Sequence, residues 1–242
     1  MNTKLEKHTL KASILLHLSP GIIIVLVYIV LVLIVEKHRM PNDFAMYITD
    51  FIGLVPIELG ILLYVTKRKT KTYNIKSQIP LLKHAKVKEY LIFIPLMATW
   101  ALLISALLNP IESMIKESFF SFIPVKYIMG SYNISLFTKD KLLITGIIGL
   151  IANGFVAPLF EELYFRGYLL PRINLSPFKS VLLNAVLFSI YHFYSPWYFF
   201  SRVLMMIPLY YWVIRKKNIR FSILAHMISN MITSISFLLS IG

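Results

Sequence analysis

PLFEELYFRGYLLP, residues 158–171, places two adjacent acids, Glu161 and Glu162, within an otherwise apolar run. Ionisable side chains are costly inside a bilayer, so those that a membrane segment retains often mark functional sites. On a helix Arg166 lies one turn after Glu162, where the two side chains can form an ion pair. Glu161 is rotated by about 100° from Glu162 and is free to point toward a bundle interior. The stretch therefore predicts one acid held by an arginine and a second acid available for chemistry.

The same residues also have a structural interpretation. An acid near the end of a membrane helix can extend to the lipid headgroups, and an i,i+4 ion pair can serve only to support its helix. The choice between the two interpretations depends on polar residues elsewhere in the chain.

The composition indicates the class of protein. Of 242 residues, 57% are hydrophobic and 15% charged, which is too apolar for a soluble domain. Repeated long apolar runs predict an all-α fold, a polytopic transmembrane helix bundle. The absence of cysteine excludes disulfides, a thiol nucleophile and cysteine metal ligands. The formal net charge is +14, but most basic residues flank apolar runs, so they indicate contact with the lipid bilayer and not with nucleic acid.

Seven apolar runs predict about seven spans. The first run lacks a small-x-small cleavage site and is followed by charged residues, so we interpret it as a retained helix and not a signal peptide. The third run is expected to end at Asn109-Pro110, and the mixed residues 111–141 predict an interfacial segment; the alternative is an eighth span. We divide the single membrane domain into N-terminal helices, residues 1–141, and a catalytic core, residues 142–242. The predicted spans are about 21–35, 44–65, 90–108, 142–170, 178–194, 197–214 and 221–241.

The basic residues predict an orientation in the membrane. Lysines are frequent at the N-terminus and in the loop of residues 67–88, and further basic residues follow the fourth and sixth spans, at Arg172 and at residues 215–220. By the positive-inside rule all of these segments are cytoplasmic. We therefore expect an integral protein of a bacterial plasma membrane with its N-terminus in the cytoplasm, and a site that opens toward the cytoplasmic side.

Two further polar sites lie within apolar runs. The fifth run contains Phe188-Ser-Ile-Tyr-His192, and the seventh contains His226 and Asn230, which share one helix face. Of six histidines, only these two lie well inside predicted spans. At about 1.5 Å of rise per residue, Glu161, His192 and His226 lie roughly 15, 20 and 9 Å from the cytoplasmic ends of their spans. Each group alone could be an interhelical hydrogen bond, but three at similar depth predict one site facing a water-filled cavity.

Two carboxylates, two histidines and an asparagine suit hydrolysis. A carboxylate beside a histidine can deprotonate water and later protonate a leaving amine, while a histidine and an asparagine can donate hydrogen bonds to an oxyanion. The sequence has neither the GxSxG motif of serine hydrolases nor the HExxH motif of helical zinc proteases. Glu161, His192 and His226 could alternatively form a three-ligand Zn²⁺ site with one open position.

At these residues the chain resembles the CPBP family of intramembrane proteases, which comprises CAAX proteases and bacteriocin-processing enzymes and is also called the Abi family. The family pattern is EExxxR, then FxxxH, then HxxxN, on successive C-terminal membrane helices. The corresponding segments here are residues 161–166, 188–192 and 226–230. The resemblance covers about residues 142–241, and its specificity comes from the order and spacing of all three motifs.

The resemblance implies an intramembrane endopeptidase, and it implies a role for each motif residue. Glu161 would activate water with the help of His192, and His226 and Asn230 would form the oxyanion site. The family was first described as metal-dependent, whereas a metal-free, glutamate-activated mechanism is now the usual reading and is the one we favour over Zn²⁺.

The remaining motif residues would support the site: Glu162 and Arg166 as a pair, and Phe188 by packing beside it. Eukaryotic CAAX members remove the last three residues of prenylated proteins. Bacterial members are associated with bacteriocin maturation, immunity and peptide signalling, and this short chain is more similar to them. The expected substrate is therefore a membrane-associated peptide, of a prenylated or a bacteriocin or pheromone type.

Two other hypotheses use the same residues. A catalytically silent immunity or scaffold protein of this fold would be expected to lack one of the motif residues, and none is missing. A proton-coupled transporter could use the acids and histidines as a relay, but the chain has no evident repeat pair. Outside the motifs, Asp50 and Glu58 lie near one face of the second span; we expect them to pair with a neighbour such as Arg202, the alternative being that they line the site.

Overall fold

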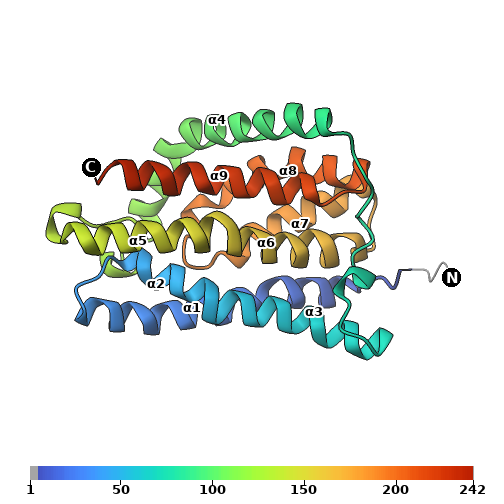
Figure 1. Ribbon diagram of the computed structural model, residues 1–242, viewed down its shortest axis with the longest axis horizontal. Coiled ribbons are helices and arrows are strands. Elements are labelled where there is room, and N and C mark those ends of the chain that lie inside the picture. The colour runs from blue at the N-terminus through green and yellow to red at the C-terminus, as the bar shows by residue number, and fades with distance from the viewer. Residues whose placement is uncertain (1–4, 242) are drawn as a thin grey trace.

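The computed structural model describes residues 5–241, which form a bundle of antiparallel helices with no strand among them (Figure 1). Two isolated β-bridges occur within these residues, His8 with Ile173 and Leu82 with Asn218. The helices are α1 (Leu10–Lys37), α2 (Asn42–Thr49), α3 (Val55–Thr70), α4 (Val87–Phe119), α5 (Lys139–Ile151), α6 (Ala157–Glu161), α7 (Pro177–Tyr191), α8 (Phe199–Lys216) and α9 (Arg220–Leu239).

Short non-α turns join several of these helices into longer rods. The π-helical segments η1 (Asp50–Leu54), η5 (Ala152–Val156) and η6 (Glu162–Leu169) continue α2 into α3, α5 into α6, and α6 into the 3₁₀ turn η7 (Leu170–Arg172). The other 3₁₀ turns lie in connections: η2 (Ile75–Gln78), η3 (Val125–Tyr127), η4 (Ile134–Leu136) and η8 (Pro196–Tyr198).

The rods account for the predicted spans. Six helical segments in the described chain are long and apolar enough to cross a membrane, and the fifth predicted run forms the shorter apolar helix α7. With 15 residues, α7 is only about 22 Å long, less than the bilayer core of about 30 Å. The chain is thus an integral membrane protein, as predicted, with six full-length helical segments and one short one.

One predicted boundary is wrong, and one alternative is absent. The third span does not end at Asn109-Pro110, because α4 continues through Pro110 to Phe119. A proline is tolerated inside a membrane helix when neighbouring groups satisfy the freed backbone carbonyl. Residues 120–138 hold only the turns η3 and η4, so the alternative eighth span is absent from this part of the structure.

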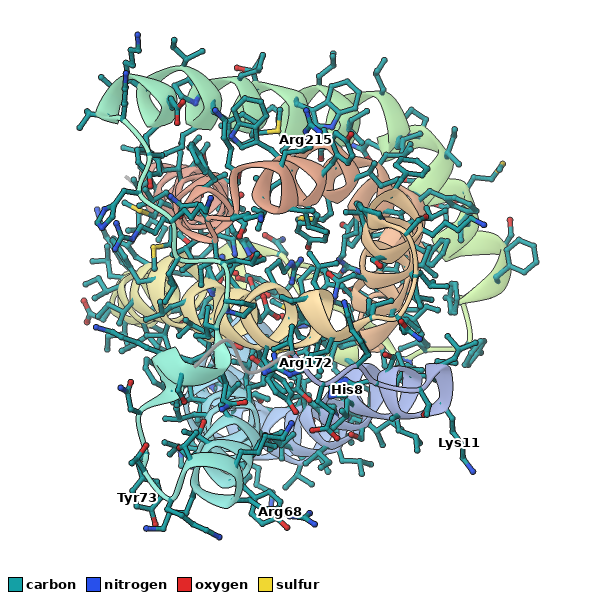
Figure 2. All side chains as sticks on the ribbon, turned by 90° about the vertical axis from the view of Figure 1, so that its right-hand side faces the viewer. His8, Lys11, Arg68, Tyr73, Arg172 and Arg215 are labelled. Atoms are coloured by element: carbon teal, nitrogen blue, oxygen red, sulfur yellow. The ribbon has the colours of Figure 1, made fainter. Side chains whose placement is uncertain are left out.

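The bundle has two ends of different character. We call the end that holds the start of α1, the connection 71–86, Arg172 and the connection 217–219 the basic end; Figure 2 looks onto it, with His8, Arg68, Arg172 and Arg215 labelled. The opposite end holds the connections 38–41, 120–138 and 192–198 and the C-terminal end of α9. Figure 1 accordingly shows the start of α1 and the end of α9 at opposite ends of the bundle.

Helix α1 packs directly against α7. Gly21 lies where the two helices meet, and a Cβ at this position would lie 2.2 Å from the backbone oxygen of Tyr191. Only glycine permits this close approach, because no side chain separates the two backbones. The contact fixes the C-terminal end of α7, the point from which His192 follows.

Candidate active site

The three π-helical segments each carry or border a residue of the candidate site. Asp50 begins η1, Asn153 lies in η5, and Glu162 begins η6 directly after Glu161, the last residue of α6. A π-bulge adds a residue to a helical turn and rotates the following side chains, and it is frequent at functional sites. Pro56 and Pro158 lie in the first turn of α3 and of α6, each just after a π-helical segment. A proline is tolerated at such a position because it needs no backbone N–H donor there.

Glu161 stands between the two histidines that the sequence predicted. Its carboxylate oxygens lie 3.8 Å from Nε2 of His192 and 3.9 Å from Nε2 of His226. Glu161 is 4% exposed and His192 is 8% exposed. Helices α6 and α9 and the end of α7 thus bring three motif residues together around one small space, at distances that leave room for a bridging atom between them.

Glu162 points away from this space and contacts the residues behind it, His226 and Arg166. Its Oε1 atom lies 3.1 Å from Nδ1 of His226, and its Oε2 atom lies 3.3 Å from Nε of Arg166. Glu162 and Arg166 are both fully buried. The predicted i,i+4 pair is therefore present, and it has a further function that the sequence did not indicate, since Glu162 also orients His226.

The Arg166 guanidinium is held by aromatic rings. Its central carbon lies 3.8 Å from the ring centroid of Phe188 and 3.8 Å from that of Tyr210. Phe188 in turn makes an edge contact with the ring of His192, with centroids 4.7 Å apart. Phe188 therefore packs between the supporting arginine and the site histidine, and a planar guanidinium is suited to stacking between two rings.

The position of His192 depends on where α7 ends. The helix stops at Tyr191, and the His192 backbone leaves the helical conformation with ψ of 57°. Its Nδ1 lies 2.8 Å from the carbonyl oxygen of Phe188. Because a carbonyl only accepts, Nδ1 carries the hydrogen, and in the neutral ring Nε2 presents a lone pair toward Glu161.

Asn230 has a partner that the sequence did not predict. Its Nδ2 donates to the backbone oxygen of Asn153 at 2.9 Å and to Asn153 Oδ1 at 3.2 Å. Asn230 lies one turn after His226 on α9, as predicted. An amide inside an apolar run was the only sequence signal for Asn153.

A cavity of about 450 Å³ opens in front of Glu161. Glu161, His192, His226 and Asn230 all line it, whereas Glu162 and Arg166 lie behind its wall. Five methionines add an apolar wall: Met46, Met97, Met129, Met205 and Met206. Methionine side chains adapt to varied shapes, so the cavity combines a polar site with a deformable apolar surface.

Asp50 and Glu58 do not form the expected ion pair with Arg202 in the described chain. No ion pair joins Arg202 to either acid within residues 5–241; its guanidinium donates to the backbone oxygen and hydroxyl of Ser195. Glu58 accepts a hydrogen bond of 2.8 Å from the Tyr191 hydroxyl. Asp50 lines the cavity, the alternative that the sequence left open, because η1 turns it inward.

The sequence interpretation placed only two histidines well inside spans, but a third histidine is also buried in a helix. His17, expected near a polar flank, is fully buried in α1, and its Nε2 lies 2.9 Å from Nδ2 of Asn184. Its other ring nitrogen bonds the Ser13 carbonyl at 2.6 Å. His17 does not line the cavity; its hydrogen bond with Asn184 joins α1 to α7.

The cavity lies away from the basic end of the bundle. The cavity reaches the opposite end of the bundle, at Met129, Gly130 and the connection 192–198, and no residue of the basic-end connections lines it. The physical reason is that the connection 71–86 folds across the basic end and closes it.

The residues also bear on the Zn²⁺ alternative. Across residues 5–241, no group of three or more histidine, aspartate, glutamate or cysteine side chains is arranged to hold a metal ion. Glu161, His192 and His226 surround a common space and are the residues that the Zn²⁺ alternative would use. We derive no step through a metal.

Fold and site together define a class of protein: a polytopic helical membrane protein with a glutamate–histidine centre inside the bundle. A family model described as type II CAAX prenyl endopeptidase Rce1-like matches residues 143–232, which include all three motifs. The match confirms the resemblance to the CPBP family, and it places the similarity to CAAX proteases in residues 143–232. No curated protein and no solved structure matches the chain.

Proposed function

We propose that the protein is an intramembrane endopeptidase that cleaves membrane-associated peptides with water activated by Glu161. The observation that carries the proposal is the position of the Glu161 carboxylate, at the cavity wall between Nε2 of His192 and Nε2 of His226. A carboxylate and an imidazole lone pair can together hold a water molecule, accept its proton and return that proton to the leaving amine.

His226 can serve the reaction in a second way. With Nδ1 bonded to Glu162, the protonated ring would direct its Nε2 hydrogen into the cavity, where it can donate to the oxyanion of a tetrahedral intermediate. Asn230 lines the same wall one turn further along α9. Its amide hydrogens are engaged by Asn153, so we assign it to positioning this wall and, after a shift of that contact, to donating to the oxyanion.

Glu162 and Arg166 support this centre from behind the cavity wall, and Phe188 lines the cavity beside it. The buried ion pair fixes Glu162, which fixes His226, while Phe188 packs against the Arg166 guanidinium and the His192 ring. Removing one partner of a buried charge pair leaves the other uncompensated, which costs about 3–5 kcal/mol in stability. We therefore expect substitutions here to reduce both activity and folding.

The test is cleavage of co-expressed precursor peptides, prenylated and bacteriocin- or pheromone-like, analysed by mass spectrometry. We expect Glu161→Gln and His192→Ala to lower product formation by about 10²- to 10⁴-fold, the usual contribution of a general base. Glu36→Gln is the matched control, because Glu36 is an exposed acid that pairs only with Lys126. All variants are compared at equal membrane abundance, with and without chelator.

The outcomes separate the hypotheses. Product that is lost in both site variants and unaffected by chelator supports a metal-free protease, whereas loss of product on chelation would favour the Zn²⁺ alternative. If both variants retain the full cellular phenotype of the parent protein and no product forms, the immunity or scaffold hypothesis replaces the protease.

A further inference from the structure

We infer that the cavity receives its peptide from the extracytoplasmic face of the membrane, at the end of the bundle opposite the basic end. The occupant is an exported or membrane-anchored polypeptide with an apolar segment that contacts the methionine wall. The inference rests on the proposed function only for the nature of this occupant, since the route of access follows from the packing.

The basic end is closed by the connection between α3 and α4. The backbone nitrogen of Lys83 donates to the oxygen of Lys217 at 2.9 Å, and that of Ile219 donates to Leu81 at 2.9 Å. These bonds hold the connection 71–86 against the turn between α8 and α9. Ile79 and Leu81 are buried in a hydrophobic cluster with residues of η7, α7, α8 and α9.

A buried arginine secures the same closure. Arg172 is 1% exposed and donates to the backbone oxygen of Gln78 at 3.0 Å and to its side-chain oxygen at 3.1 Å. Figure 2 shows Arg172 near the middle of the basic end. Between this layer and the site lie Tyr210 and Phe221, both fully buried. A water or peptide at the basic end is therefore separated from Glu161 by packed side chains.

The opposite end presents the open part of the cavity. Three lining residues are exposed: Gly130, Tyr198 and Thr233. Gly130 and Tyr198 belong to the connections at the opposite end, and Thr233 lies in the second half of α9, toward the same end. The walls thus lead from Glu161 toward this end of the bundle.

The distribution of charge assigns this end to a side of the membrane. Among the described residues, most lysines and arginines lie at the basic end, in residues 7–11, 67–88, 172–179 and 215–220. By the positive-inside rule this end faces the cytoplasm. The open end of the cavity therefore faces outward, so the peptide reaches Glu161 after export or from the outer leaflet.

The chain contains no cysteine, which allows a direct test. Three single-cysteine variants report the cavity wall, its mouth and the basic end: Met205→Cys, Tyr198→Cys and Tyr73→Cys. A small, charged, membrane-impermeant thiol reagent is applied to intact cells and to inverted membrane vesicles. We expect Met205→Cys and Tyr198→Cys to be labelled at least tenfold faster in intact cells, and Tyr73→Cys only in inverted vesicles.

The opposite results overturn the inference. It fails if Met205→Cys reacts from the same side as Tyr73→Cys, if it reacts from neither side, or if Tyr73→Cys reacts in intact cells. Thr233→Cys replaces Met205→Cys if the latter does not fold, as judged by detergent gel filtration. Labelling needs no hydrolysis, so a Glu161→Gln background should give the same rates; loss of cleavage with unchanged labelling would then count against the proposed function alone.

Discussion

Replacing Gly21 by alanine would push α1 away from the end of α7. The new Cβ would stand 2.2 Å from the Tyr191 carbonyl oxygen and 2.9 Å from its Cδ2. Unstrained heavy-atom contacts are about 3.5 Å, so the two backbones must separate by roughly 1 Å. The nearest atom is backbone and cannot rotate aside. Overpacking of this kind costs about 1–3 kcal/mol.

The consequence is measurable as thermal stability in detergent. At about 2–4 °C per kcal/mol for a chain of this size, Gly21→Ala should lower Tm by roughly 2–12 °C. It should also lower the proposed peptidase activity at temperatures where the protein stays folded, because Tyr191 precedes His192 and its hydroxyl holds Glu58.

Gly60→Ala is the matched control, since a Cβ at Gly60 would meet nothing within 4 Å. Alanine there should leave Tm unchanged or raise it slightly, through its higher helix propensity. The reasoning is refuted if Gly21→Ala is as stable as the parent protein, or if the two alanine variants lose stability equally.

Three further predictions follow from particular contacts. Tyr191→Phe removes the only side-chain donor to Glu58 in the described chain and should destabilise the protein by about 1–3 kcal/mol; an unchanged Tm would contradict this. Arg166→Lys keeps the charge but loses the planar group stacked between two rings, so Tm and the proposed peptidase activity should both fall. A variant with the Tm and activity of the parent protein would show that charge alone suffices. Burial, with the nearby charge of Arg172, lowers the pKa of His8 from 6.5 to about 4. The unfolded chain therefore binds the proton first, and stability should fall as the pH decreases from about 6.5 to 4; in His8→Gln this part of the pH dependence of Tm should disappear, and its persistence would exclude His8 as the source.

Much of the fold follows from local properties of the sequence. Seven apolar runs predicted the helical segments because a bilayer requires every backbone group to be satisfied within its own helix. The spacing of Glu162 and Arg166 predicted their ion pair for the same kind of local reason, one helical turn. The misplaced boundary at Pro110 lies where neighbouring helices override a local signal.

The partners within the site were decided by tertiary packing. The sequence indicated that Glu161, His192 and His226 lie at similar depth, but not that Glu162 would bond His226 or that Asn153 would bond Asn230. Those contacts depend on how the π-helical segments rotate each rod. Rotation of a helix about its axis is set by packing against its neighbours, and apolar periodicity does not specify it when most faces are apolar.

Hydrophobicity and charge in the sequence alone determined that the chain is a helical membrane protein, which end is basic, and which polar residues lie within its spans. Only the tertiary structure decided which end of the cavity is closed. Closure depends on the connection 71–86 folding back onto the turn between α8 and α9, through backbone bonds such as that of Ile219 to Leu81. Contacts between segments so distant in the chain leave no local pattern in the sequence.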